Sequence, residues 1–269
     1  MGKIVWLASY PKSGNTWVRA FLHNYIAQPD APQSINALTD FSVAECVSRF
    51  FHKPGETLSN EEVQRRRPGV HEGLTKLHDD LVFVKTHNAN LAVHNVPLCT
   101  PEHTAGAIYI IRDPRDVVLS YSAFTGRSFD EIIDFMGNDG AANRATEAQV
   151  FELLASWSAH VNSWGITGNR LLVRYEDLLG APEKHFGRIV NFLGGEPERN
   201  RLRRAVAFSD FKILSAQESE QGYNASSPDA LAPFFRAGMS GQWKARLTPG
   251  QIARIENDHG VVMRKFGYL

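Results

Sequence analysis

Lys12 and Gly14 lie in a short turn between a predicted strand, Ile4–Ser9, and a predicted helix, Thr16–Ala27. A strand, a tight glycine-containing turn and a helix N-terminus form a cradle for an anion, because free backbone N–H groups and the helix dipole face the bound group. Lys12 adds a positive charge, and three further side chains of the turn can donate hydrogen bonds: Ser13, Asn15 and Thr16. An ordinary strand–helix turn capped by Asn15 or Thr16 would explain the glycine, but it would leave Lys12 and Trp17 without a role.

A second polar cluster, Lys85-Thr86-His87, ends the apolar run Leu81–Thr86. Strand alternation places Lys85 and His87 on the same side, at the carboxyl end of a strand, where open α/β sheets bind their ligands. His87 is then well placed to act as a general base. Taken alone, a histidine at a strand end is more often a structural hydrogen-bonding group.

A third cluster follows the apolar run 107–111, where Arg112 occupies the strand tip. Asp113 and Pro114 are typical of an N-cap and a first helical residue, and Asp116 supports this helix start in the manner of a capping box. Arg112 can reach an anion in the same crevice as Lys12, and the helix behind it carries Ser120. A simple ion pair between Arg112 and a carboxylate such as Asp116 is the alternative.

The elements that must position these clusters alternate short apolar runs with longer amphipathic stretches, which predicts βα units around a parallel sheet. The predicted strands are Ile4–Ser9, Leu81–Thr86, Ala107–Arg112 and Arg170–Tyr175. The predicted helices are Thr16–Ala27, Pro114–Phe124 and Glu147–Gly165. In the last of these, apolar residues at helical spacing include Trp157 and Trp164, which we expect to be core residues.

The chain has 269 residues with 43% hydrophobic and 22% charged side chains, which is enough apolar material for a sizeable core and excludes a disordered chain. We expect one α/β domain over residues 1–269. The 29 basic and 29 acidic residues balance, so a whole-chain basic field for nucleic acid is absent. The two cysteines, Cys46 and Cys99, cannot form a disulfide scaffold. No H-E-x-x-H motif or paired Cys/His spacing predicts a metal site. No apolar run is long enough to predict a membrane span. No signal peptide fits upstream of the first strand, so we expect a cytoplasmic protein.

Two polar segments, residues 29–80 and 217–240, interrupt the α/β pattern and are predicted to be lids or acceptor-binding segments. The run Arg65-Arg66-Arg67 in the first segment is expected to be a solvated helix face rather than a phosphate site. Aromatic residues that can line an apolar pocket, or belong to the core, are Phe50, Phe51, Tyr121, Phe124, Phe129, Tyr223, Phe234 and Phe235.

The clusters together resemble the cytosolic-type sulfotransferases that use 3′-phosphoadenosine 5′-phosphosulfate (PAPS). Residues 10–17 resemble the 5′-phosphosulfate loop of this family, a P-loop-like strand–loop–helix motif, and residues 85–87 its Lys-Thr-His catalytic segment. Arg112 and Ser120 have the spacing of the family's 3′-phosphate contacts. Residues 174–178 resemble its Tyr-Glu-Asp turn, 209–211 its Ser/Thr-x-Phe pair, and 236–244 its C-terminal Arg-Lys-Gly-x-x-Gly-Asp-Trp-Lys signature. The six motifs occur in family order.

The resemblance implies a role for each matching residue in sulfuryl transfer from PAPS to a small-molecule acceptor, with 3′-phosphoadenosine 5′-phosphate (PAP) as the product and no metal. It implies His87 as general base, Lys12 at the bridging oxygen, and Lys85 at the sulfuryl oxygens. Ser120 would restrain Lys12. The implied nucleotide-binding residues are Lys12, Ser13, Gly14, Asn15, Thr16, Trp17, Arg112, Ser120, Tyr175, Ser209, Phe211, Arg236 and Gly238.

Three positions depart from the family pattern. Asn15 replaces a threonine but keeps a donor in its amide, Ala237 removes a lysine from the C-terminal signature, and Gln242 replaces an aspartate. The chain also lacks the short C-terminal dimer motif of many animal members, so the oligomeric state stays open.

Two other functions fit parts of the pattern. A P-loop kinase would need the sequence G-x-x-x-x-G-K-[ST], but here the lysine precedes the glycine. A non-catalytic binder of 3′-phosphoadenosine nucleotides would have no use for the intact set of Lys12, Lys85 and His87. The acceptor is expected to offer a hydroxyl, or less readily an amine.

Overall fold

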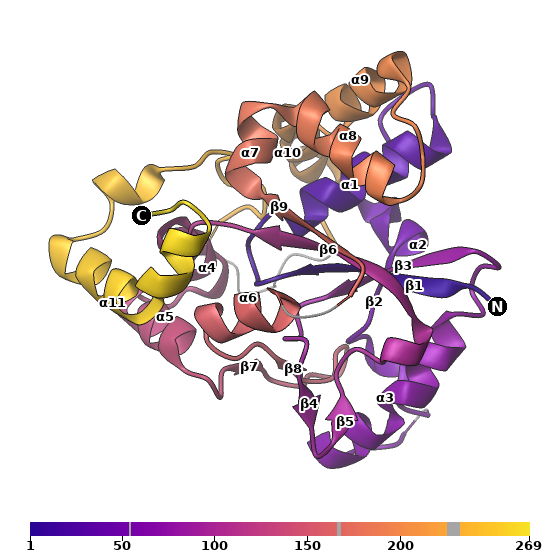
Figure 1. The fold of residues 1–269 in the computed structure, drawn as a ribbon, viewed down its shortest axis with the longest axis horizontal. Helices are drawn as coiled ribbons and strands as arrows, with labels where there is room; N and C mark the ends of the chain where they lie inside the picture. The colour runs from indigo at the N-terminus through magenta and orange to yellow at the C-terminus, as the bar shows by residue number, and fades with distance from the viewer. Residues whose placement is uncertain (54, 166–167, 225–231) are drawn as a thin grey trace.

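The structure is a computed structural model. Its core is a five-stranded parallel sheet in the order β2-β3-β1-β6-β9 (Figure 1). The described residues are 1–53, 55–165, 168–224 and 232–269. The strands are β1 (Lys3–Ser9), β2 (Val43–Ala44), β3 (Leu81–Thr86), β6 (Thr104–Ile111) and β9 (Arg170–Arg174).

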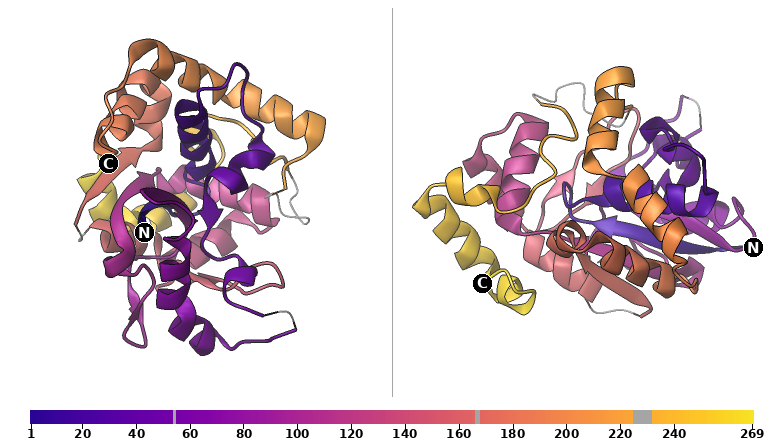
Figure 2. Two further views of the ribbon diagram at one scale, coloured as in Figure 1. Left: turned by 90° about the vertical axis from the view of Figure 1, so that its right-hand side faces the viewer. Right: turned by 90° about the horizontal axis from the view of Figure 1, so that it is seen from above.

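Alternate residues of β1 enter two different hydrophobic clusters, because successive side chains of a strand point to opposite faces of the sheet. Trp6 belongs to the cluster that also contains residues of helices α4 (Pro114–Thr125), α5 (Phe129–Gly137), α6 (Trp157–Gly165) and α11 (Pro249–Lys265). Leu7 belongs to the cluster on the opposite face, with residues of α1 (Asn15–Ala27), α8 (Pro182–Phe192) and α9 (Arg199–Phe208). Figure 2 shows these helices on both sides of the sheet. The predicted α/β fold with a parallel sheet flanked by helices is confirmed.

The remaining elements connect and cover these layers. They are η1 (Ile35–Ala37), α2 (Leu38–Phe41), η2 (Ser48–Phe50), α3 (Asn60–Leu74), β4 (Ala92–Val93), β5 (Val96–Pro97), η3 (Pro101–His103), β7 (Ala142–Asn143), β8 (Glu152–Leu153), α7 (Tyr175–Gly180), α10 (Phe211–Gln221) and η4 (Gln242–Ala245). Among the described residues no helix is both long enough and apolar enough to cross a membrane.

The predicted helix Glu147–Gly165 is wrong over its first ten residues. The helix α6 starts at Trp157, and the preceding residues include β8, which pairs antiparallel with β7. Ala155 has a positive φ of 57°, which breaks any helix that runs through it. Both tryptophans of α6 are buried, as predicted: Trp157 is 0% exposed and Trp164 3%.

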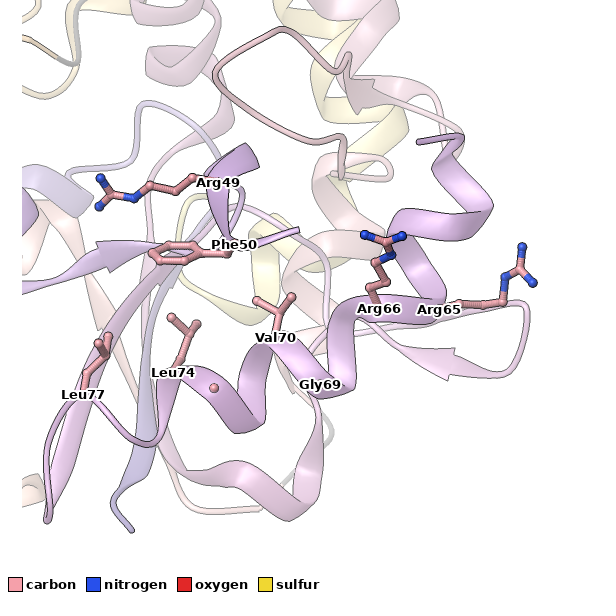
Figure 3. Close-up of a pocket in the computed structure, with 9 residues that line it drawn as sticks. Arg49, Phe50, Arg65, Arg66, Gly69, Val70, Leu74 and Leu77 are labelled. Carbon is pink, nitrogen blue, oxygen red and sulfur yellow. The ribbon is translucent and has the colours of Figure 1, made fainter. Parts of the chain in front are cut away.

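The segment 29–80 is more regular than predicted, because it contains the 15-residue helix α3 and contributes β2 to the central sheet. The arginine run lies on α3, but only Arg65 is exposed. Arg66 pairs with Glu56, and Arg65 and Arg66 line an open groove together with Phe50 (Figure 3). Of the segment 217–240, residues 225–231 lie outside the described residues.

Arg67 contradicts the prediction of a solvated face, because its guanidinium is completely buried. It pairs with the buried carboxylate of Glu45 and donates to the carbonyl of Phe151 at 2.8 Å. His71 and Asn88 also contact Glu45, at 3.3 and 3.0 Å. A buried carboxylate requires such partners, and removing one of them leaves a charge without compensation.

Replacing Arg67 with methionine should therefore lower the free energy of unfolding by about 3–5 kcal/mol, because it strands the Glu45 charge in the core. The matched control is Arg65→Met on the exposed face of the same helix, which should change stability by less than about 0.5 kcal/mol. Urea denaturation of both variants checks this. Equal stability of the two variants would contradict a buried, paired Arg67.

Candidate active site

The predicted site residues meet at one edge of the sheet. The central strands β1, β3, β6 and β9 run parallel and end at Ser9, Thr86, Ile111 and Arg174. Four of the six predicted motifs lie at the ends of these strands, so the topology brings those four to a common carboxyl edge.

The turn after β1 has the backbone of an anion-binding loop. Lys12 has a φ of 66° and Gly14 a φ of 101°, so the chain reverses sharply before α1. Gly14 is the N-cap of α1, and no side chain caps the helix there. A Cβ atom on Gly14 would lie 2.6 Å from the ring of Tyr175, which explains the glycine together with its φ. The first N–H groups of α1 thus remain available to an anion.

Buried donors around this turn that have no hydrogen-bond partner include the hydroxyl of Ser13, the indole N–H of Trp17 and the Nε of Arg112. Buried polar groups are nearly always paired, so unpaired donors that gather at one site indicate a ligand rich in oxygen atoms. These donors fit the phosphosulfate nucleotide that the sequence predicts.

Asn15 and Thr16 are buried in the first turn of α1, but the amide of Asn15 is engaged elsewhere. It donates to the carbonyl of Leu7 at 2.8 Å and to the hydroxyl of Ser9 at 3.3 Å. The expected donor role of this amide toward a nucleotide is therefore wrong. Asn15 fixes the end of β1 to the helix, and it can serve an anion through its backbone N–H alone.

Arg112 joins two loops that are distant in the sequence. Its guanidinium donates to the carbonyls of Lys12 at 3.0 Å and Met239 at 2.9 Å, and it lies 4.4 Å from the ring centroid of Tyr175. The alternative of an ion pair with Asp116 is excluded by these contacts, since the carboxylate of Asp116 accepts from the backbone N–H of Gly241 and Trp243 instead. Asp116 anchors the C-terminal loop and is not part of a capping box; Asp113 alone caps α4.

The C-terminal loop presents Arg236 and Gly238 next to these groups. Arg236 donates to the side-chain oxygen of Gln242 at 2.9 Å. The glutamine that replaces the family's aspartate therefore binds Arg236 through an uncharged side chain. Burial, Arg112 and Arg246 lower the pKa of Arg236. Gly238 has a φ of 59°, and a Cβ there would lie 2.4 Å from the ring of Phe211. The loop therefore packs tightly on Phe211, which is an expected nucleotide contact.

Ser120 lies between two groups that the site uses. Asp116, Ser120 and Phe124 are spaced by one turn along α4 and so share a face of this helix. Asp116 holds the C-terminal loop, and the ring of Phe124 lies 4.2 Å from the amine of Lys12. This face of α4 places Ser120 between the two.

The amine of Lys12 lies in an aromatic, positively charged environment. It is 4.2 Å from the centroid of Phe124 and 3.9 Å from that of Phe234. Burial lowers the pKa of Lys12 to about 7, and nearby Arg112, Arg236 and Lys85 contribute to this shift while Glu218 opposes it. Four cations so close together favour a polyanionic ligand.

His87 presents a free nitrogen at the same edge. Its Nδ1 lies 2.7 Å from the carbonyl oxygen of Ser9, which can only accept, so Nδ1 carries the proton and Nε2 keeps its lone pair. Desolvation and the charge of Lys85 lower the pKa of His87, whereas Glu152 raises it. The imidazole is therefore neutral near pH 7, as a general base must be.

Of the residues expected to contact the adenine, only some lie close together in the structure. Trp17 packs edge-on against Tyr175 with a centroid distance of 5.8 Å, and both Trp17 and Phe211 pack on the cluster around Leu214. Ser209 is different, because its buried hydroxyl donates to the carbonyls of Ala205 and Val206 at the end of α9. The side chain of Ser209 therefore closes a helix and is not free to hold a base.

The predicted pocket aromatics fall into separate groups. Phe124 and Phe234 contact Lys12, and Tyr223 and Phe235 pack with Phe234. Phe51 lies instead in a distinct cluster around Arg67, away from these contacts.

Sequence analysis missed Glu152 and His160, which bind the backbone of His87. Glu152 accepts from the N–H of His87 at 2.9 Å, and Nε2 of His160 is 3.1 Å from the His87 carbonyl. Glu152 lies in the part of the predicted helix 147–165 that is not helical, and His160 lies in the part that is. No sequence signal placed either residue beside His87. No cluster of three or more His, Cys, Asp or Glu residues that suits a metal occurs in the described part of the chain.

Comparison with known proteins shows the family to which the chain belongs. The family model described as the sulfotransferase domain matches residues 3–267. Sulfotransferase 1A1 of Canis lupus familiaris is 26% identical over 97% of this chain and 83% of the relative. Sulfotransferase 1B1 of Mus musculus is 24% identical over 95% and 80%. The chain belongs to the sulfotransferase family and is a sulfotransferase.

Solved structures show the same fold. Mouse sulfotransferase SULT7A1, complexed with PAP, superposes with a TM-score of 0.61 at 20% identity, covering 97% of this chain and 85% of that one. Retinol dehydratase in a complex with retinol and PAP gives 0.64 at 15% identity, covering 97% and 81%.

Lys12 should titrate near pH 7 in the nucleotide-free protein, because burial and neighbouring cations disfavour its charged form. Reductive ¹³C-methylation followed by NMR titration measures this, and the Lys12→Met variant assigns the signal. A Lys12 resonance that titrates only above pH 9 would contradict the arrangement of cations described here.

Proposed function

We propose that this sulfotransferase moves the sulfuryl group of PAPS to a hydroxyl of a small-molecule acceptor, with His87 as general base. The observation that carries the proposal is the meeting of Lys12, Lys85 and His87 at one sheet edge, beside the unpartnered donors of Ser13 and Trp17. We treat residues 1–269 as one catalytic domain, and a cytoplasmic location remains a prediction.

Nucleotide binding would divide between the two loops that Arg112 joins. The turn 10–14 and the first N–H groups of α1 would hold the 5′-phosphosulfate. Arg112, Ser120, Arg236 and the N–H of Gly238 would hold the 3′-phosphate, and Trp17, Tyr175 and Phe211 would enclose the adenine. Ala237 offers no charge here, so the 3′-phosphate would depend on Arg112 and Arg236.

The chemistry follows from charges and a proton acceptor already in place. Sulfuryl transfer, like phosphoryl transfer, has a loose in-line transition state, so positioning and charge stabilisation dominate. His87 Nε2 would take the proton of the acceptor hydroxyl as its oxygen attacks sulfur. Lys85 would stabilise the sulfuryl oxygens. Lys12 would stabilise the bridging oxygen, and the negative charge there raises the pKa of Lys12 and keeps it protonated.

The acceptor would lie next to the aromatic group formed by Phe124, Tyr223, Phe234 and Phe235. These rings contact one another or Lys12, so an apolar acceptor bound against them would have its hydroxyl close to the cations. An apolar small molecule with one hydroxyl suits this surface better than a sugar does.

Replacing His87 with alanine should lower turnover by about 10²–10⁴-fold, because the acceptor proton loses its base. Turnover is measured as the loss of ³⁵S-labelled PAPS. The acceptor is 2-naphthol, or water if the protein does not use this phenol. PAP affinity should stay within about threefold. His78→Ala, an exposed histidine before β3, is the matched control and should leave turnover unchanged. Near-normal turnover of His87→Ala would contradict the role of His87 as general base.

A further inference from the structure

Glu152 has a buried carboxylate that contacts the backbone of His87, the proposed base. It lies in β8 opposite Asn143 of β7 and is 2% exposed. Its Oε1 accepts from the N–H of His87 at 2.9 Å, and its Oε2 accepts from the amide of Asn143 at 3.1 Å. The hydroxyl of Tyr121 in turn donates to Asn143 at 3.0 Å. Both carboxylate oxygens are thus held in fixed positions.

Both the backbone and the ring of His87 are held by hydrogen bonds. Its N–H donates to Glu152, its carbonyl contacts His160, and its ring Nδ1 contacts the carbonyl of Ser9 at the end of β1. The next residues are joined to β8 as well: Leu153 donates to the Asn88 side chain at 2.9 Å and accepts from the N–H of Ala89 at 2.7 Å. The direction of the imidazole therefore depends on where β8 lies.

Glu152 also supplies negative charge to this part of the site. Burial raises its pKa, but the pairing with His87, the charge of Lys85 and hydrogen bonds from the His87 N–H and Asn143 more than offset that effect, so its pKa is lowered and the carboxylate is ionised. The other titratable groups that face it are neutral near pH 7, since burial raises the pKa of Cys46 and Tyr121 and lowers that of His160 to about 4. Lys85 opposes the formation of an imidazolium at His87, and Glu152 favours it.

A neutral side chain could make the same hydrogen bond at lower cost. Glutamine could accept from the His87 N–H through its oxygen, with the Asn143 amide and the Tyr121 hydroxyl reversed so that both still have partners. It would avoid burying a charge, which is the expensive part of this arrangement. A buried charge at this point therefore indicates an electrostatic role toward its neighbours.

We propose that Glu152 is a positioning residue for sulfuryl transfer: it fixes the His87 backbone so that Nε2 faces the acceptor hydroxyl, and its charge stabilises the imidazolium. This inference rests on the proposed role of His87. In the step, the acceptor O–H proton moves to Nε2, the acceptor oxygen bonds to sulfur, and the bond from sulfur to the nucleotide oxygen breaks. The positive charge then forms on the ring next to Glu152.

The test is a double-mutant cycle on the full-length protein, with turnover of ³⁵S-labelled PAPS measured as for His87→Ala. Glu152→Gln should lower kcat at least tenfold, while KM for PAPS, PAP affinity and melting temperature stay close to wild type. In the His87→Ala background the same substitution should change kcat less than twofold, because Glu152 acts through His87. Glu72→Gln, which removes a charge from an exposed pair with Lys76, is the control and should have no effect.

Two results would overturn the inference: a kcat of Glu152→Gln within twofold of wild type, or an equal loss of kcat in both backgrounds. If Glu152→Gln does not fold, Asn143→Ala loosens the same carboxylate, and its loss of kcat should likewise vanish without His87; persistence of that loss would overturn the inference too. Near-normal turnover of His87→Ala alone would instead refute the proposed function.

Discussion

The hydrogen bonds from Arg112 to the carbonyls of Lys12 and Met239 are the constraint on which the site depends. They join the tip of β6 to a turn 100 residues earlier and to a loop 127 residues later in the chain. The guanidinium also stacks on Tyr175, so three separate segments are fixed around one cation. Its Nε has no partner in this structure, which leaves it available for a ligand in the space between these segments.

Around Arg112, buried charges are arranged in two ways. Glu45 and Arg67 neutralise each other and stabilise the segment that carries Lys85 and His87. Burial and the charge of Arg112 lower the pKa of both Lys12 and Arg236, and an anionic ligand relieves this repulsion. One set of charges thus fixes the fold, and the other favours a negatively charged substrate. His87 stays neutral between them and can accept a proton.

The sequence predicts four of the five central strands and the edge that carries most of the candidate site, because strands buried on both faces are continuous apolar runs and parallel strands end at one edge. It does not predict contacts that depend on distant partners. Arg67 looks solvent-exposed until Glu45, 22 residues away, is placed beside it. Asn15 and Asp116 have the right chemistry for local caps or ligands, but their partners lie in β1 and in the C-terminal loop. The apolar spacing of residues 147–156 imitates a helix although the chain turns at Ala155, and this hid Glu152.

The central claim is that this sheet edge recognises a nucleotide with a 3′-phosphate. Calorimetric titration of the purified protein with PAP, beside AMP and without added metal, tests it most directly. Charge-assisted hydrogen bonds from Arg112 and Arg236 should make PAP bind at least about 100-fold more tightly than AMP. Equal affinities for PAP and AMP would show that the site does not read the 3′-phosphate, and the assignment of PAPS as the donor would be contradicted.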